Sequence, residues 1–196
     1  MNWGIIISLV FALLVIGGFF YFYVATYNRF MVLYNAANAT MGQIRVALRK
    51  RLDLISSLAE AVGSYAKYEK DTLESITRMR ASIGAASPEE IIKLERESRN
   101  FLARLLAVVE QYPNLRTSEL VQNLMNSSKE IEDEIARHRY TYNNIVQQYN
   151  TMIDTIPSNF VARLRGLTKL PYLDVGGPEI ERRPSLTFYG ESRSGQ

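Results

Sequence analysis

The single histidine of the sequence, His138, stands four residues after Glu134. On a helix this spacing places the imidazole and the carboxylate on one face, where they could bind a metal ion or relay a proton. A helical di-metal site, however, repeats a Glu-x-x-His motif on two helices, and the sequence has no second histidine. We therefore interpret His138 as a packed side chain, and the sequence predicts no metal site, no cofactor, no catalytic site and no enzymatic activity.

Two carboxylates stand within apolar patterns and need partners. Asp53 follows Arg49 by four residues, which predicts an ion pair between them on a helix surface. Glu69 falls on an apolar stripe, and a buried carboxylate requires a basic partner. The candidates for that partner are Arg80, Arg137 and Arg139.

Two asparagines, Asn143 and Asn150, stand two helical turns apart, beside Tyr142 and Tyr149. Buried asparagines set the register between packed helices through hydrogen bonds, as they do in coiled coils. We favour this interpretation, and a groove that binds a peptide or a ligand is the alternative.

Composition excludes some classes of function. The chain has 196 residues and a formal net charge of +3, which is too weak to indicate a nucleic-acid partner. It contains no cysteine, so disulfides, thiolate metal sites and a cysteine nucleophile are excluded.

The elements that position these residues begin with an apolar run from Ile5 to Val24, whose 20 residues include no charged side chain. As a helix the run spans roughly 30 Å, about the thickness of the hydrocarbon core of a bilayer. The alternatives are a cleaved signal peptide, for which the run is too long, and a buried core helix, which would show a polar face. We predict a transmembrane anchor over residues 1–26, with the lipid bilayer as a partner.

The charges that flank the run predict its orientation. No basic side chain precedes it, whereas Arg29, Arg45 and Arg49 follow it, and basic residues stay on the cytoplasmic side of a membrane. We predict a single-pass protein of the cell membrane, with its N-terminus outside and the bulk of the chain in the cytoplasm.

After the anchor, apolar residues recur at steps of three and four, a pattern typical of helices that bury one face. The pattern runs unbroken from the anchor to about Gly84. It restarts at a predicted capping box formed by Ser87 and Glu90, and it stops before Pro113.

A third helix is predicted from about residue 120 to Pro157, and one or two turns follow over residues 159–165, closed by Gly166. Helices joined by short loops are antiparallel neighbours. The predicted fold class is therefore all-α, with the transmembrane helix continuing into a long, coiled-coil-like antiparallel three-helix bundle over residues 27–166, including a short fourth helix. Residues 167–196 are predicted to form an extended or disordered tail, with a short strand at Leu186–Tyr189.

Helix lengths predict an uncovered surface. Residues 27–83 would form a helix of ~85 Å, whereas the returning helix of residues 88–112 measures only ~37 Å. Unless the first helix bends back near Gly42, its membrane-proximal part keeps an exposed apolar stripe, which normally marks a partner surface. We therefore predict a homo-oligomer that forms through this stripe. Its candidate residues are Phe30, Leu33, Tyr34, Ala37 and Met41.

Short motifs spread over nearly the whole chain outside the tail carry a resemblance to a known family. They include Leu48–Ile55 (LRKRLDLI), Tyr65–Lys70 (YAKYEK), Arg139–Val146 (RYTYNNIV), Ile156–Phe160 (IPSNF) and Leu170–Leu173 (LPYL). In order and spacing these motifs resemble the LemA family. The resemblance implies a membrane-anchored helical protein with its bulk in the cytoplasm and no established reaction, and it makes neighbouring membrane proteases candidate partners.

These features predict a membrane-anchored helical scaffold or interaction protein that self-associates or recruits membrane partners. The alternative is a membrane sensor whose ligand-binding bundle relays a signal through the anchor helix. A metal-binding or enzymatic bundle is disfavoured, because the sequence lacks the convergent histidines, cysteines or paired carboxylates that such a site needs.

Overall fold

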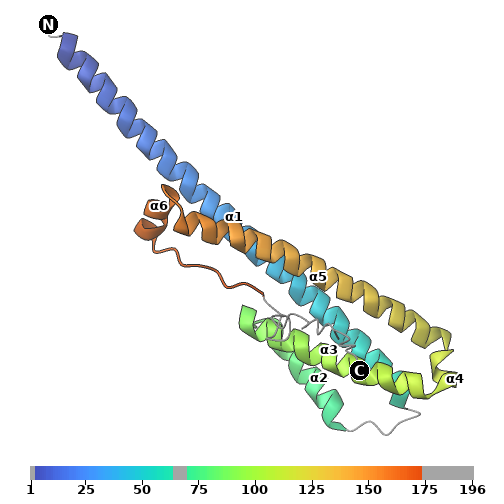
Figure 1. Ribbon diagram of the computed structural model, residues 1–196. Helices are drawn as coiled ribbons and strands as arrows, with labels where there is room; N and C mark the ends of the chain where they lie inside the picture. The colour runs from blue at the N-terminus through green and yellow to red at the C-terminus, as the bar shows by residue number, and fades with distance from the viewer. Residues whose placement is uncertain (1–2, 64–69, 174–196) are drawn as a thin grey trace, which may run out of the picture.

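The computed structural model describes residues 3–63 and 70–173, and every regular element in these ranges is helical (Figure 1). The helices are α1 (Trp3–Gly63), α2 (Lys70–Ser82), α3 (Pro88–Gln111), α4 (Pro113–Arg116), α5 (Glu119–Asp154) and α6 (Ser158–Arg165). The predicted all-α fold class is therefore confirmed. The strand predicted at Leu186–Tyr189 lies outside the described residues, as does the rest of the tail after residue 173.

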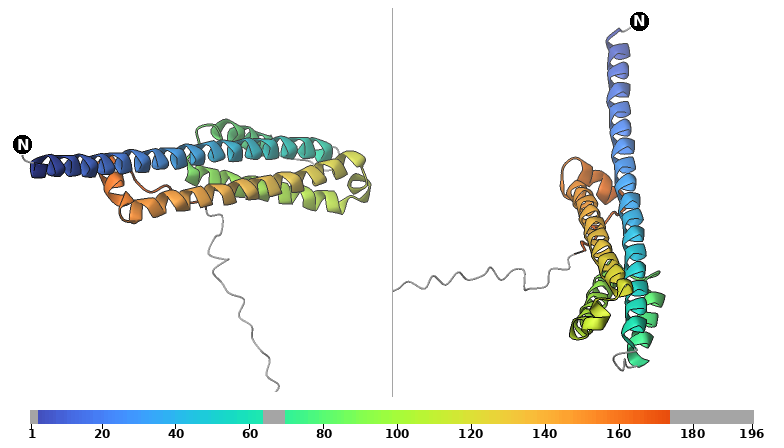
Figure 2. Two further views of the ribbon diagram at one scale, coloured as in Figure 1. Left: turned by 90° about the horizontal axis from the view of Figure 1, so that it is seen from above. Right: turned by 90° about the vertical axis from the view of Figure 1, so that its right-hand side faces the viewer.

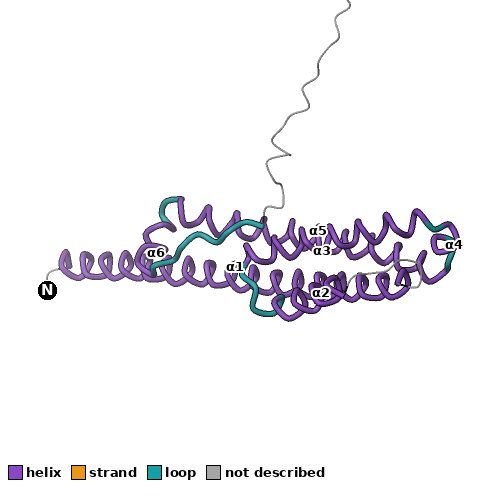
Figure 3. The backbone as a smooth tube through the Cα atoms, turned by 90° about the horizontal axis from the view of Figure 1, so that it is seen from below, coloured by secondary structure: helices purple, strands orange, loops and turns teal. Residues whose placement is uncertain are grey.

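The helices form an elongated bundle around α1, which contacts α2, α3, α5 and α6. Most of the first part of α1 (residues 3–24, here the apolar half) extends past the other described helices, with α6 beside its last turns, and residues 27–63 (the packed half) lie within the bundle (Figures 1 and 2). α5 runs back beside the packed half, and α6 lies against α1 where α5 ends. α2 and α3 lie at the opposite end of the bundle (Figure 3).

α3 begins where the sequence predicts it. Ser87 Oγ accepts a hydrogen bond from the backbone N–H of Glu90 at 3.2 Å, and Glu90 Oε2 accepts one from the backbone N–H of Ser87 at 2.7 Å. Pro88 follows in the first turn, where its missing N–H would have had no helical partner. The predicted capping box is thus confirmed.

The prediction of one continuous helix up to Gly84 is wrong. α1 ends at Gly63, and α2 folds back beside it, so that Arg80 forms an ion pair with Asp53 (Figure 1). A continuous helix would hold these two residues ~40 Å apart. The return is favoured because apolar side chains of this arm join the main hydrophobic core, and such packing outweighs local helix propensity. These side chains are Ile76, Met79 and Ile83.

The prediction of an uncovered stripe on the first helix is also wrong, because α5 covers it. α5 has 36 residues and is ~54 Å long, and the packed half of α1 is ~55 Å long. The prediction compared the first helix with the helix of residues 88–112, which is too short to cover it. It also placed the end of the first helix near Gly84, whereas α1 ends at Gly63. Four of the five predicted interface residues are at most 6% exposed: Phe30, Leu33, Ala37 and Met41. Tyr34, the fifth, is 41% exposed.

A small hydrophobic cluster at the end of the bundle next to the apolar half of α1 joins α1, α5 and α6. It consists of Phe30, Leu33, Tyr149 and Ala162. The rings of Phe30 and Tyr149 meet edge to face, with their centroids 5.4 Å apart. An aromatic pair of this geometry contributes about 0.5–1.5 kcal/mol beyond its area burial, so the cluster fixes α6 beside the apolar half of α1.

Candidate membrane-interface site

The apolar half of α1 is the part of the fold with the most exposed apolar surface. Within the described ranges it is the one helix long and apolar enough to cross a membrane, and none of its most apolar stretch is buried. Ile5 and Val24, the ends of the predicted span, both lie in α1. A helix that is apolar on every face requires an apolar environment, and the bundle does not supply one here.

α6 is positioned beside this half by the sequence signals at its two ends. α5 ends at Asp154, and α6 begins after Pro157, a residue that cannot continue a helix. α6 ends at Gly166, whose φ of 62° lies in the left-handed region, and the Gly166 N–H donates to the carbonyl of Ala162. The predicted short helix and its closing glycine are confirmed.

Opposite faces of α6 have different surroundings. Val161 and Ala162 are buried, and Ala162 belongs to the Phe30 cluster. Phe160 and Leu164, four residues apart, are exposed, and so is Ile156 just before the helix. α6 therefore adds a second exposed apolar surface next to that of α1.

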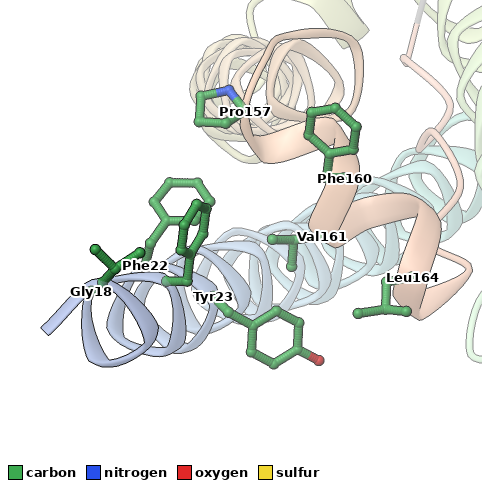
Figure 4. A pocket seen from close by; sticks show the side chains of 9 residues that line it. Gly18, Phe22, Tyr23, Pro157, Phe160, Val161 and Leu164 are labelled. Atoms are coloured by element: carbon green, nitrogen blue, oxygen red, sulfur yellow. The ribbon is translucent and has the colours of Figure 1, made fainter. Parts of the chain in front are cut away.

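An apolar groove of about 610 Å³ lies between α1 and α6 (Figure 4). In Figure 4, Phe160, Val161 and Leu164 of α6 stand across from Phe22 and Tyr23 of α1. The lining side chains are all apolar, apart from the phenol of Tyr23. They are Val15, Gly18, Phe19, Phe22 and Tyr23 from α1, and Pro157, Phe160, Val161 and Leu164 from the α6 region.

Arg165, at the end of α6, lies over two tyrosine rings of α1. Its guanidinium carbon is 4.7 Å from the ring centroid of Tyr27 and 5.6 Å from that of Tyr23, which is within the range of cation–π contacts. Arg163 stands in the same last turn, where the helix dipole favours a positive charge. Tyrosine rings and guanidinium groups thus gather where the apolar half of α1 ends, an arrangement typical of a membrane–water interface.

The two asparagines do not join helices, so that prediction is wrong. Each binds both main-chain groups of one residue in the segment after α6 (residues 167–173, here the return segment). Asn150 donates to the carbonyl of Leu170 and accepts from its N–H, both at 2.9 Å. Asn143 does the same with Leu173, at 3.0 and 2.9 Å. The alternative of a peptide-binding groove is closer to what is found, with the chain itself as the peptide.

The spacings of helix and return segment match. Seven residues on α5 separate Asn143 from Asn150 by ~10.5 Å, and three extended residues separate Leu170 from Leu173 by ~10 Å. Leu173 is buried, and Leu170 packs against both hydrophobic clusters. Sequence reasoning identified the asparagines but could not find their partners, because the return segment is distant in sequence and has no helical or strand pattern.

A charge group around two buried side chains lies where α1, α3 and α5 meet. It consists of the buried Arg51 and Glu95 and the more exposed Arg99, Glu132 and Arg139, and is here called the buried charge group. Arg51 and Glu95 are each 1% exposed. Arg51 pairs with Glu132, and Glu95 accepts hydrogen bonds from Arg99 and Arg139, both at 2.9 Å. Burial lowers the pKa of Arg51 from its usual value, while the charges of Glu132 and Glu95 oppose that shift. Paired in this way, the charges specify how the three helices meet.

Sequence reasoning missed this group, although a signal was present. Arg51 follows Leu48 by three residues and precedes Ile55 by four, so it falls on the buried stripe of α1. Arg139, one of the predicted partners of Glu69, pairs with Glu95, and Glu69 lies outside the described residues.

His138 lies half-buried on α5, with its Nε2 3.8 Å from Glu134 Oε1. Both carboxylate oxygens of Glu134 accept hydrogen bonds from Lys50 Nζ at 3.0 Å, which links α5 to α1. In the described part of the chain, no three His, Asp or Glu side chains form a group that could hold a metal ion. The prediction that Asp53 pairs with Arg49 is wrong, since Asp53 pairs with Arg80.

Comparison with known proteins places these features in a family context. The sequence matches the LemA family profile over residues 40–188. Protein LemA of Metamycoplasma hominis is 27% identical over 176 residues, which cover 89% of this chain and 80% of that protein. Magnetosome protein MamQ of Magnetospirillum gryphiswaldense is 24% identical over 173 residues, covering 74% of this chain and 64% of MamQ. Magnetosome protein MamQ 2 of Paramagnetospirillum magneticum is 40% identical over 73 residues, covering 37% of this chain and 27% of that protein.

Proposed function

The chain belongs to the LemA family, and we propose that it is a membrane-anchored helical scaffold that presents its bundle to partners at the membrane surface. The observation that carries this proposal is the pair of environments along α1, which is exposed and apolar in one half and buried along one face in the other. Both halves belong to one uninterrupted helix, so the bundle connects to the anchor without a loop. The packed half extends the bundle ~55 Å from the bilayer.

We propose that the N-terminus lies outside the cell membrane and the bundle lies in the cytoplasm. Three basic side chains gather at the end of the bundle that adjoins the span: Arg29, Arg163 and Arg165. The sequence before the span has no basic side chain. This asymmetry follows the rule that basic residues near a span stay on the cytoplasmic side, and α6 adds to the bias that Arg29 gives by itself.

We propose no catalytic role. Among the described residues, the candidates for catalytic side chains are the buried charge group and the two asparagines of α5. The charge group is hydrogen-bonded internally, and the asparagines bind the backbone of the return segment. These bonds assign both groups to holding the fold.

As partners we propose a second copy of the chain and other membrane proteins, proteases among them. The face of α1 that the bundle leaves open supports self-association, because Val32, Ala39 and Val46 are exposed there and recur every seven residues. A seven-residue repeat is the spacing of a coiled-coil seam. This face replaces the stripe predicted from sequence, most of which α5 covers.

Membrane extraction tests the anchor. The full chain, produced in bacterial cells, is expected to stay with the membranes during washing with alkaline carbonate and to retain its N-terminal residues in an intact-mass measurement. Recovery of the chain in the supernatant would contradict the proposal, and so would cleavage close to residue 26.

A second experiment tests self-association separately. The chain is transferred from membranes to nanodiscs, and the mass of the protein in each disc is measured. Dimers or larger species are expected. Monomers in every disc would remove self-association from the proposal and leave the anchor standing.

A further inference from the structure

α6 leaves an apolar surface open directly beside the anchor. Phe160 is 63% exposed, and Leu164 and Ile156 are exposed with it. Burying apolar side chains of this size is favourable relative to leaving them in water. The i, i+4 spacing of Phe160 and Leu164 places these two side chains together on one face of α6, and this exposed apolar patch needs an apolar contact.

The groove beside this patch belongs to both α6 and the membrane-crossing part of α1. Its α1 lining runs from Val15 to Tyr23, which is ~12 Å along the helix axis. Half of a hydrocarbon core is ~15 Å thick, so the groove has the depth of one leaflet. It opens on the same surface that the anchor turns toward lipid.

Positive charge stands at the polar end of the groove. Arg165 lies over Tyr23, the last groove residue of α1, and Arg163 is exposed in the same turn of α6. Guanidinium groups form bidentate hydrogen bonds with phosphate oxygens. An apolar groove one leaflet deep, with arginines at its polar end, matches the two parts of a phospholipid, its acyl chain and its headgroup.

We propose that α6 is an interfacial helix and that the groove between α1 and α6 holds an acyl chain of a phospholipid from the bundle-side leaflet. Arg163 and Arg165 then face the lipid phosphates. This inference rests on the proposed function, because it requires α1 to cross the membrane. It goes beyond that function in assigning a lipid-binding site and a second membrane contact to the chain.

Fluorescence quenching by brominated lipids tests the contact. The single tryptophan of the chain is removed by Trp3→Phe, and Phe160→Trp places a new one on α6. The protein is reconstituted into vesicles of phosphatidylcholine and phosphatidylglycerol, with bromines on the acyl chains. The fluorescence of the Phe160→Trp variant is expected to fall at least about twofold relative to the same vesicles without bromine, because bromine quenches tryptophan only at short range and an interfacial helix buries its apolar face among the acyl chains.

The matched control places tryptophan at Tyr140 of α5, a position of similar exposure at 71%. Tyr140 is ~20 Å from the end of α5 that adjoins the membrane, so no quenching is expected there. Flotation of both variants with the vesicles reports the anchor independently. Equal quenching at positions 160 and 140 in vesicles that carry the protein would overturn the inference and leave the proposed function intact. Failure of both variants to float would overturn both.

A groove-filling variant separates the acyl-chain site from simple proximity to lipid. Gly18 lines the groove, and a Cβ added there meets nothing within 4 Å, so Gly18→Leu fills the space without a clash. Combined with Phe160→Trp, Gly18→Leu is expected to reduce the quenching about twofold, because the leucine side chain displaces the acyl chain of the lipid from the groove beside residue 160. Unchanged quenching would overturn the assignment of the groove. Crosslinking of a Phe160→Cys variant to a second copy would also overturn it, since a protein would then occupy the patch.

Discussion

The two halves of α1 are equally helical, but they differ in where their apolar side chains lie. In the apolar half they cover every face, and the exposed ones include Phe11, Leu13 and Leu14. In the packed half they follow steps of three and four, and that stripe is buried under other helices of the same chain, as Phe30 and Ile44 show. A helix with one apolar face can be buried by packing other helices against that face. A helix that is apolar on every face has more apolar surface than the other helices of this chain can cover.

The exposure of side chains along α1 therefore depends on every helix that runs back beside it, and not only on the next helix in the sequence. α5 has the length of the packed half and buries the stripe that contains Phe30 and Ile44, so this stripe needs no partner from outside the chain. In the apolar half, α6 covers part of one side and adds exposed apolar residues of its own. The apolar surface that the chain leaves uncovered is therefore concentrated in the apolar half and α6.

The largest expected effect comes from charge in the apolar half. A variant with Leu13→Arg and Leu14→Arg should lose most of its membrane association, because each arginine at the centre of a span costs about 2.5–3.5 kcal/mol. The matched control places the same two arginines at Asn38 and Gln43, which are exposed in the packed half. Flotation after carbonate washing should find the control in the membranes. Equal retention of the two variants would contradict the division of α1.

Next in size is truncation of a covered side chain in the packed half. Phe30→Ala should destabilise the bundle by about 3–5 kcal/mol, because it opens a cavity beneath Tyr149. Phe11→Ala, in the apolar half, should change the unfolding free energy by less than about 0.5 kcal/mol. Denaturation in nanodiscs, followed by circular dichroism, measures both. A loss below about 1 kcal/mol for Phe30→Ala would mean that α5 does not cover this position.

Removing one buried charge should have an effect of similar or smaller size. Glu95→Gln removes the carboxylate partner of Arg139 and one of the two partners of Arg99, whose other partner is Glu132, and it should cost about 3 kcal/mol. Asp53→Asn, which breaks an exposed ion pair with Arg80, should cost at most about 1 kcal/mol. The same denaturation measurement compares the two. If both variants lost at most about 1 kcal/mol of stability, burial would not increase the contribution of a charge in the bundle.

The return segment provides a smaller test of the cover over the packed half. Asn150→Ala removes both hydrogen bonds to Leu170 and should cost about 1–3 kcal/mol. The amide of Leu170 should then exchange with solvent faster, as hydrogen exchange with mass spectrometry can detect. Asn123→Ala, at an exposed position of α5, is the control and should leave this exchange unchanged. Unaltered protection in Asn150→Ala would show that other contacts hold the segment.

The smallest expected effect is on the pH dependence of stability. Burial raises the pKa of Tyr142 from its usual value, with the charge of Glu89 adding to the shift. The folded state therefore favours the neutral phenol. Its contribution to the free energy of unfolding is fully present below about pH 10 and is lost as the pH rises further. Tyr142→Phe should lose less stability than the unaltered chain between neutral and alkaline pH. Parallel pH profiles of the two proteins would contradict this.

Local signals predicted the parts of the fold that local chemistry determines. The charge-free run places the span, Ser87 and Glu90 place the start of α3, and Gly166 closes α6. These features depend on residues that are close to each other in sequence, so no knowledge of the tertiary structure is needed.

Long-range packing determines what the sequence did not reveal. The end of α1 at Gly63 depends on the burial of Ile76 and Met79 in the shared core. The Asn150 contact depends on a segment that returns twenty residues later. The groove was missed although Phe160 and Leu164 show the right spacing, because its other wall belongs to α1, far away in the sequence.

The labelling rate of a cysteine at position 37 tests most directly whether the packed half of α1 is covered by other helices of the same chain. The chain has no native cysteine, so Ala37→Cys and the control Asn38→Cys, at an exposed position outside the seven-residue repeat, each carry one thiol. In vesicles whose cytoplasmic face is accessible, a membrane-impermeant maleimide should label position 37 roughly tenfold more slowly than position 38, or slower still, because labelling requires local opening of the bundle. Equal labelling rates, or disulfides between copies at position 37, would contradict the account.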